Sequence, residues 1–194
     1  MTGDLEAASA ALRRGRLVVV PTDTVYGVAA LPRSHGGVAA IFAAKGRPPT
    51  KPIPVLAATV DDLLDVVIFD PRAHVVAAAL WPGPLTLVLP RRPDWPYDLG
   101  GDPATVAVRL PANDVAAALL ERTGPLAVTS ANRSGAPSAM TVEQARSALG
   151  DQVAVYLDGG PSSDTPSTVV SLVGEIRLLR EGAVSLERIQ SAIE

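Results

Sequence analysis

The chain has 194 residues, 47% hydrophobic and only 4% aromatic, and its formal net charge is -3, so any contact with nucleic acid requires a local basic patch. It has no cysteine, which excludes disulfides, thiolate metal sites and a cysteine nucleophile. The mean hydropathy is +0.25, yet no apolar run approaches the ~20 residues that a membrane-spanning helix requires.

Apolar runs and amphipathic stretches alternate along the whole chain. In chain order the pattern predicts a helix (4–14), a strand (17–20), a turn-rich connection (22–27), a helix (34–44), a strand (53–57), two helices (61–66, 71–80), two strands (85–89, 105–109), a helix (113–122), a strand (126–129), a helix (142–149), three strands (153–157, 168–172, 176–179) and a last helix (186–193). Asn113, Thr141 and Ser185 are the expected caps of the last three helices, because their side chains can accept hydrogen bonds from the first helical amides.

This interleaving predicts an α/β fold with a mixed sheet, formed by a single domain over residues 1–194. The last two expected strands are joined too tightly for a parallel crossover, so part of the sheet should be antiparallel. Residues 90–103 have the composition of a linker, and we expect them to form a surface excursion rather than a domain boundary.

A basic, proline-rich segment follows the helix expected over 34–44. This basic segment reads Lys45-Gly46-Arg47-Pro48-Pro49-Thr50-Lys51-Pro52. No acid lies close to it in sequence, since the nearest are Asp23 and Asp61. The prolines hold the segment extended and stop the helix. A stiff loop with fixed cations fits a polyanion such as a triphosphate; the alternative is an ordinary solvated loop.

Polar residues stand at the ends of several expected strands. Ser130 and Asn132 follow one strand, and Arg109 and Arg180 close two others. In open α/β sheets ligands collect at the carboxyl ends of strands, where arginines can pair with carboxylate or phosphate. Each residue alone could be a cap, a turn residue or an exposed charge. Their repetition at several strand ends indicates a binding site.

Other common active sites lack their sequence signatures here. The chain has neither GxxxxGK[ST] nor GxGxxG, no GxSxG elbow, no HExxH and no paired carboxylate motif. Its two histidines, His35 and His74, lie far apart, which disfavours a histidine-rich metal centre. Asp4 and Glu6 stand where a signal peptide needs cations, so we expect a cytoplasmic protein.

Seven short motifs occur in a fixed order along nearly the whole chain. They are PTDTVYG (21–27), AKGRP (44–48), WPGPLT (81–86), TVAVR (105–109), SAN (130–132), STV (167–169) and LREG (179–182). Together they resemble the YrdC-type L-threonylcarbamoyladenylate synthases, in the short, single-domain form. The resemblance implies a YrdC-like fold, a twisted sheet of parallel and antiparallel strands with helices packed around it and a basic central cavity.

The resemblance also implies an activity. Such enzymes use L-threonine, bicarbonate or CO2, and ATP with Mg2+. Threonine is carboxylated at its amine, and the carbamate attacks the α-phosphate to give threonylcarbamoyl-AMP and pyrophosphate. A partner complex then transfers the threonylcarbamoyl group to adenosine 37 of tRNA. The carbamate is already an anionic nucleophile, so catalysis would rest on charge neutralisation and on alignment, which alone can supply ~7–11 kcal/mol.

Roles for particular residues follow from the same resemblance. The catalytic residues would be Lys45 and Arg47. The ATP-binding residues would be Arg47, Lys51, Thr105, Asn132 and Arg180, and the threonine-binding residues Thr24, Arg109, Ser130 and Ser167; no residue is expected to hold a metal by itself. The chain departs from longer relatives at Leu56, where they carry a histidine near the threonine, and it ends soon after Arg180, without their C-terminal domain.

Two other functions remain as alternatives. One is a double-stranded RNA-binding module of the same fold without catalysis, which the negative net charge and the scarcity of aromatic residues disfavour. The other is a carbamoyl-transfer module that uses carbamoyl phosphate, for which the flanking domains are missing. Gly46 and the prolines of the basic segment also make a lid movement conceivable.

Overall fold

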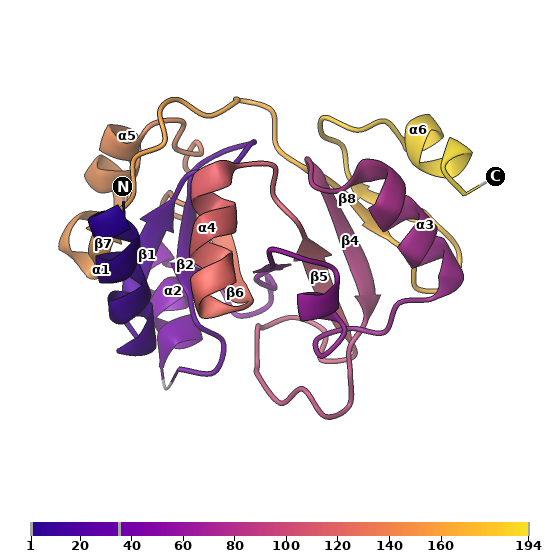
Figure 1. Ribbon diagram of the computed structural model, residues 1–194, viewed down its shortest axis with the longest axis horizontal. Coiled ribbons are helices and arrows are strands. Elements are labelled where there is room, and N and C mark those ends of the chain that lie inside the picture. The colour runs from indigo at the N-terminus through magenta and orange to yellow at the C-terminus, as the bar shows by residue number, and fades with distance from the viewer. Residues whose placement is uncertain (1, 35, 194) are drawn as a thin grey trace.

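The protein, described by a computed structural model over residues 2–34 and 36–193, contains one mixed sheet with helices around it (Figure 1). Its strands are β1 (Leu17–Val20), β2 (Gly27–Ala30), β3 (Val55–Leu56), β4 (Leu85–Pro90), β5 (Thr105–Arg109), β6 (Leu126–Ser130), β7 (Val153–Tyr156), β8 (Thr168–Ser171) and β9 (Arg177–Arg180). Their order across the sheet is β7-β1-β2-β6-β3-β5-β4-β8-β9. The β1–β7, β3–β5 and β4–β8 pairs are parallel and the remaining pairs antiparallel, so the predicted mixed sheet is confirmed.

Six α-helices surround the sheet in the part of the chain that the structure describes. They are α1 (Thr2–Arg13), α2 (Gly37–Lys45), α3 (Pro71–Leu80), α4 (Asp114–Thr123), α5 (Val142–Leu149) and α6 (Leu186–Ser191), with short 3-10 turns over Asp61–Leu63 and Gly150–Gln152. Helices α1, α2, α4 and α5 lie around β1, β2, β6 and β7, whereas α3 and α6 lie beside β4 and β8 (Figure 1). Within the described residues, every helix is too short or too polar to cross a membrane.

Strand β1 is buried on both faces because helices cover both. Val19 belongs to the hydrophobic cluster that includes Ile41 of α2, whereas Val18 belongs to the cluster that includes Leu12 of α1 and Leu119 of α4. Successive side chains of a strand point to opposite faces, so a strand covered on both sides reads as an unbroken apolar run. This is why the sequence predicts the bounds of β1 correctly.

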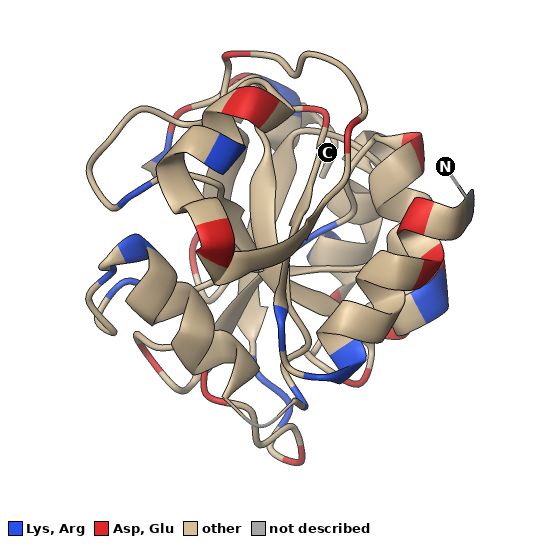
Figure 2. Ribbon diagram, turned by 90° about the vertical axis from the view of Figure 1, so that its left-hand side faces the viewer, with Lys and Arg blue, Asp and Glu red and all other residues tan. Residues whose placement is uncertain are grey.

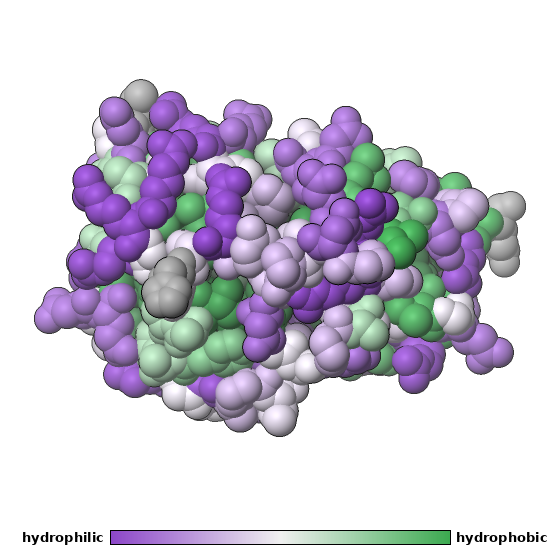
Figure 3. All heavy atoms as spheres, turned by 90° about the horizontal axis from the view of Figure 1, so that it is seen from below, coloured by the Kyte–Doolittle hydropathy of each residue, from purple (hydrophilic) through white to green (hydrophobic). Residues whose placement is uncertain are grey.

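Charged residues belong mainly to the helices and loops around the sheet (Figure 2). The face seen from below mixes hydrophilic residues with smaller hydrophobic patches (Figure 3). Large exposed hydrophobic side chains are scattered in sequence, at Leu64, Ile68, Val75, Met140 and Leu179.

Strand β2 is the element that the sequence pattern does not predict. Its residues are Gly, Val, Ala and Ala, of which only valine favours strands. It forms because β1 and β6 pair with it on both sides. A Cβ atom on Gly27 would lie 2.5 Å from Cγ1 of Val128, so the close approach of β6 requires glycine there. Long-range pairing, not local propensity, creates this strand.

Three helices are shorter than predicted, among them the last, which was expected over 186–193 and ends at Ser191 as α6. The helix expected over 61–66 is only the 3-10 turn Asp61–Leu63. The helix expected over 34–44 begins at Gly37 as α2, and His35, which was expected near its start, lies outside the described residues. The strand expected over 53–57 is reduced to Val55–Leu56. Pro52 and Pro54, which lack the amide hydrogen that a ladder needs, flank that strand's expected start.

The three predicted caps are confirmed. Oδ1 of Asn113 accepts hydrogen bonds from the amides of residues 115 and 116 at 3.1 and 3.0 Å. The hydroxyls of Thr141 and Ser185 each accept one from the amide three residues later, at 3.3 Å in both cases. These caps fix the start of α4, α5 and α6. That residues 1–194 form a single domain stays a prediction.

Candidate functional site

A cavity of about 680 Å³ lies against the sheet, and its walls include residues of the neighbouring strands β2, β6, β3, β5, β4, β8 and β9. Its lining contains four basic side chains, Arg47, Lys51, Arg109 and Arg180, and no Asp or Glu among the described residues. Hydroxyl groups are the other frequent polar component of the walls. Ligand cavities of ~300–1,000 Å³ are typical for small molecules, so this one is large enough for a nucleotide beside a small second ligand.

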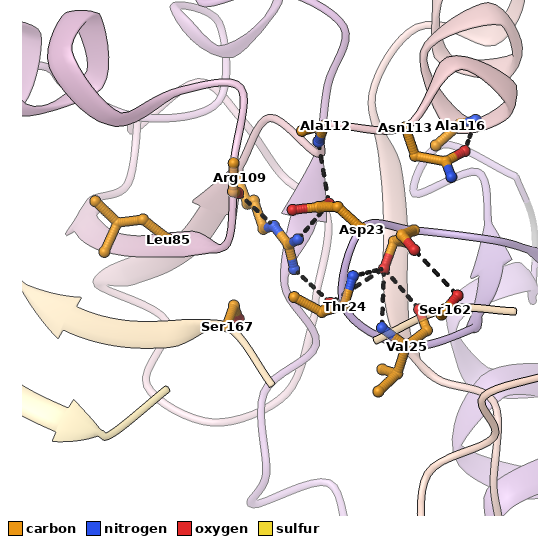
Figure 4. Close-up of polar contacts among 12 residues, drawn as sticks. Asp23, Thr24, Val25, Leu85, Arg109, Ala112, Asn113, Ala116, Ser162 and Ser167 are labelled. Carbon is orange, nitrogen blue, oxygen red and sulfur yellow. Dashed lines mark hydrogen bonds and ion pairs between the residues drawn. The ribbon is translucent and has the colours of Figure 1, made fainter. Parts of the chain in front are cut away.

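Arg109, at the end of β5, is the most constrained of these cations (Figure 4). Its Nε donates to the carbonyl of Gly83 at 2.9 Å, its Nη1 to Oγ1 of Thr24 at 3.0 Å, and its Nη2 to Oδ1 of Asp23 at 2.5 Å. Burial lowers the pKa of the Arg109 guanidinium, and the charge of Asp23 opposes that shift. An arginine stays protonated nonetheless. The site therefore holds a positively charged guanidinium whose orientation is fixed by three hydrogen bonds.

Asp23 holds Arg109 from outside the cavity lining. Its Oδ1 also accepts a hydrogen bond from the amide of Ala112 at 3.0 Å, while its Oδ2 is buried without a partner among the described residues. The pair is nearly buried, with the side chains of Arg109 and Asp23 6% and 13% exposed. Asp23 neutralises one of the four cations of the lining. That the cavity as a whole is basic stays a prediction.

Thr22 folds the turn that brings Thr24 to Arg109. Its hydroxyl donates to the carbonyl of Val25 at 2.6 Å and accepts from the amides of Thr24 and Val25 at 3.2 and 3.3 Å. Ser162 donates to the carbonyl of Thr22 at 3.1 Å from the other side (Figure 4). Local hydroxyl-to-backbone bonds of this kind stabilise turns. The turn is therefore built to present Thr24.

Arg180 and Ser167 meet on the opposite wall, where β8 and β9 pair. Arg180 donates to the carbonyl of Ser167 at 3.1 and 2.7 Å and to its hydroxyl at 2.9 Å. The Ser167 hydroxyl lies 2.9 Å from the hydroxyl of Thr86, which is buried and also lines the cavity. Sequence reasoning missed Thr86, although a threonine inside the apolar run 85–89 is a signal that could have found it.

The Arg47 side chain hydrogen-bonds to the backbone of its own basic segment. Nε of Arg47 donates to the carbonyl of Lys51 at 3.0 Å, and Nη2 donates to the carbonyl of Pro52 at 2.9 Å. Gly46 ends α2 with φ 61°, a left-handed conformation that glycine adopts at little cost. This geometry places both Arg47 and Lys51 in the cavity lining.

Lys45 lies elsewhere, inside what we call the lysine cage, formed by Lys45, Ser130 and Asn132. Its Nζ donates to the carbonyl of Ser130, to the carbonyl of Asn132 at 2.6 Å and to Oδ1 of Asn132 at 3.2 Å. Lys45 is only 2% exposed and does not line the cavity. Burial, and secondly the charge of Arg47, lowers its pKa to about 8. Nδ2 of Asn132 is also occupied, by the carbonyls of residues 133 and 136.

The structure thus brings some of the expected site residues together and leaves others apart. The cavity lining contains Thr24, Arg47, Lys51, Arg109, Ser130, Ser167 and Arg180. Lys45 and Asn132 are not in the lining, nor is Thr105, which lies at the opposite end of β5 from Arg109. Leu56 does line the cavity, beside Arg109 in the β3–β5 pairing. The role expected of each residue stays a prediction.

Among the residues that the structure describes, no three His, Cys, Asp or Glu side chains gather in a way that could hold a metal ion. The four basic side chains of the cavity lining, by contrast, are suited to the phosphate or carboxylate groups of a ligand.

Comparisons with known proteins agree with one another. The Sua5–YciO–YrdC family model, described as "Telomere recombination", matches residues 10–182. A Mycobacterium tuberculosis protein, provisionally named a threonylcarbamoyl-AMP synthase, is 46% identical over 96% of this chain and 88% of its own length. The threonylcarbamoyl-AMP synthase of Bacillus subtilis is 39% identical over 99% of this chain and 58% of its own length.

Among solved structures, Pyrococcus abyssi Sua5 complexed with L-threonine superposes with a TM-score of 0.92 and 37% identity. The match covers 97% of this chain and 57% of that one. This chain therefore spans a little more than half the length of the Bacillus and Pyrococcus relatives, and most of the Mycobacterium relative.

Proposed function

Because this chain belongs to the Sua5–YciO–YrdC family, we propose that it is an L-threonylcarbamoyladenylate synthase. It forms threonylcarbamoyl-AMP and pyrophosphate from L-threonine, bicarbonate or CO2, and ATP. The observation that carries the proposal is the convergence of Arg47, Arg109 and Arg180, from three distant segments, on one cavity of about 680 Å³. Such a cavity matches a substrate pair that carries a triphosphate and a carboxylate.

The reaction requires little proton transfer by the protein. The threonine amine and bicarbonate give a carbamate and water. A carbamate oxygen then attacks the α-phosphorus, the bond from that phosphorus to the β-phosphate oxygen breaks, and pyrophosphate leaves. Since the nucleophile is already an anion, the protein's task is to align two anions and to neutralise their charge, which fits a cavity lined by cations.

Arg109 is the proposed partner of the threonine carboxylate. Three of its five N–H donors are used within the described residues, by Gly83, Thr24 and Asp23. Two N–H groups, one on each terminal nitrogen, remain for a bound carboxylate. The L-threonine complex of P. abyssi Sua5 supports an amino-acid site in this fold. We assign the remaining threonine contacts to the hydroxyls of Thr24, Ser130 and Ser167, which line the same cavity.

Arg47, Lys51 and Arg180 are the proposed partners of the triphosphate, because they line the cavity from two separate elements. Mg2+ would enter with ATP, held by phosphate oxygens, since the described residues offer no three-ligand protein site. Nucleotide contacts of Asn132 and Thr105 stay predictions. A phosphate contact of Lys45 would require its Nζ to leave the three oxygens of the lysine cage.

The product would then pass to a partner complex that transfers the threonylcarbamoyl group to adenosine 37 of tRNA. We place this step in the cytoplasm. Threonylcarbamoyl-AMP is a mixed anhydride of a carbamic acid and a phosphate, so only an acyl-transfer reaction can consume it productively. Any RNA contact of this chain would serve that transfer.

The test is a turnover assay of the purified protein with MgATP, labelled bicarbonate and L-threonine. Pyrophosphate release and label in threonylcarbamoyl-AMP should both depend on L-threonine. Omission of threonine is the control for ATP hydrolysis. Threonine-independent release, or no turnover together with salt-sensitive binding of double-stranded RNA, would contradict the proposal and favour a binding module.

A further inference from the structure

The 90–103 loop is anchored to the core instead of extending freely into solvent. Trp95 and Leu99 are 9% and 4% exposed and belong to the main hydrophobic cluster. Arg91 donates to the carbonyls of Trp95 at 2.9 Å and Tyr97 at 2.5 Å, and its guanidinium lies 4.9 Å from the centre of the Trp95 ring. The loop is therefore stiff enough to support a neighbour.

That neighbour is the basic segment. The amide of Gly101 donates to the carbonyl of Pro49 at 2.8 Å, and the amide of Ile53 donates to the carbonyl of Leu99 at 2.9 Å. These backbone hydrogen bonds join the 90–103 loop to Pro49, in the middle of the basic segment, and to Ile53, just after the end of that segment. No side chain of the 90–103 loop is needed for either bond.

Two consecutive glycines make this contact possible. Gly100 and Gly101 have φ angles of +76° and +68°, which other residues rarely adopt. A Cβ atom on Gly100 would lie 2.3 Å from the carbonyl oxygen of Pro49 and 2.9 Å from Cζ of Phe42. A Cβ atom on Gly101 would lie about 3 Å from three ring carbons of Pro52. Any side chain at these positions would therefore push the basic segment away.

We propose that the Gly100–Gly101 turn is a positioning element that fixes the basic segment so that Arg47 and Lys51 face the cavity. Neither glycine lines the cavity, so both act through Pro49 and Pro52. Arg47 in turn donates to the carbonyl of Pro52, so a displaced Pro52 would turn the guanidinium away. The functional part of this inference rests on the proposed function, in which these cations bind the triphosphate.

The test compares Gly100→Ala with a matched control, Gly124→Ala. Gly124 has φ +75°, nearly the value of Gly100, but a Cβ atom there would meet nothing within 4 Å. Both substitutions place an alanine at a positive φ, and only the first places a Cβ atom against the basic segment. Isothermal titration of the wild type and both variants with MgATP, and separately with L-threonine, gives the affinities. We expect Gly100→Ala to weaken MgATP about tenfold or more and to leave L-threonine unchanged, since small misplacements of binding groups are costly.

A second measurement keeps the inference separate from the proposed function. In amide NMR spectra, Gly100→Ala should shift the resonances of Thr50 and Lys51, and Gly124→Ala should not. Equal MgATP affinity in the two variants, or unshifted resonances, would overturn the inference. Should the wild type fail to bind MgATP, the proposed function fails and the NMR result alone decides the positioning role. If Gly100→Ala does not fold, Gly101→Ala replaces it, because the three atoms nearest to its Cβ atom would be ring carbons of Pro52 rather than backbone atoms.

Discussion

Two parts of one short segment use positive charge in opposite ways. In the lysine cage, Lys45 is 2% exposed and gives its ammonium group to Ser130 and Asn132, outside the cavity lining. Two residues later Arg47 reaches the lining, as does Lys51. A buried cation with its donors occupied is held by the fold, whereas a cation at a cavity wall is available to a ligand. Neighbouring cations of one motif therefore need separate tests.

Arg109 stands between these extremes. It is buried like Lys45, yet it lines the cavity like Arg47. Asp23 makes this possible, because a buried guanidinium needs a partner and Asp23 supplies one from behind. Burial alone therefore does not exclude a ligand role, provided that some donors remain free.

The largest effect should come from removing the lysine of the cage. Lys45→Met leaves the carbonyls of Ser130 and Asn132 and the Asn132 amide oxygen without a donor, so the free energy of unfolding should fall by about 3–5 kcal/mol. Urea denaturation measures it. Lys51→Met, at an exposed position, is the control and should change stability by about 0.5 kcal/mol or less. A stable Lys45→Met variant that has lost MgATP binding would instead place Lys45 on the ligand.

The reverse pattern is expected at Arg47. Arg47→Ala removes a cavity cation whose hydrogen-bond partners within the described residues are exposed carbonyls of its own segment. Turnover, measured as kcat/KM for pyrophosphate release, should fall about 100-fold, or about 2.7 kcal/mol, with the unfolding transition nearly unchanged. Arg92→Ala is the control, because Arg92 is exposed and makes a surface ion pair with Asp94. Wild-type turnover in Arg47→Ala would remove this residue from the phosphate site.

Asp23→Asn tests the intermediate case. The amide can still accept a hydrogen bond but no longer neutralises Arg109, so we expect the free energy of unfolding to fall by about 1.5–3 kcal/mol. The KM for L-threonine should rise by a larger factor than the KM for ATP. Asp94→Asn breaks an exposed ion pair and should cost about 0.5 kcal/mol at most. If both substitutions had the same small effect, the buried pair would not position Arg109.

The smallest effect is a dependence on pH. The pKa of Lys45 is about 8 in the folded protein, below the 10.5 of an unperturbed lysine. Above pH 8 the folded state loses this proton before the unfolded state does, so the contribution of Lys45 to stability rises between pH 8 and 10.5. The three acceptors of the cage favour the charged form and reduce the effect. The destabilisation by Lys45→Met should therefore grow by about 1 kcal/mol from pH 7.5 to pH 9.5 in urea titrations. A destabilisation that shrinks with pH would contradict the lowered pKa.

Local signals explain what the sequence predicted well. The apolar run of β1, the bounds of α3, β5 and α5, and the caps Asn113, Thr141 and Ser185 depend on residues close together in the chain. The accumulation of polar residues at strand ends likewise predicted the cavity that contains Arg109 and Arg180. Ordered motifs identified the family in the same way.

Tertiary structure alone decided the remaining features. Strand β2 exists because two distant strands pair with it, and Gly100 and Gly101 matter because the basic segment lies against them. Nothing near Lys45 in sequence distinguishes it from Arg47, and nothing near Thr105 shows that it lies outside the cavity lining. The physical reason is common to all of them. A side chain's periodicity and capping are local properties, whereas its burial and its partners are set by segments that only folding brings into contact.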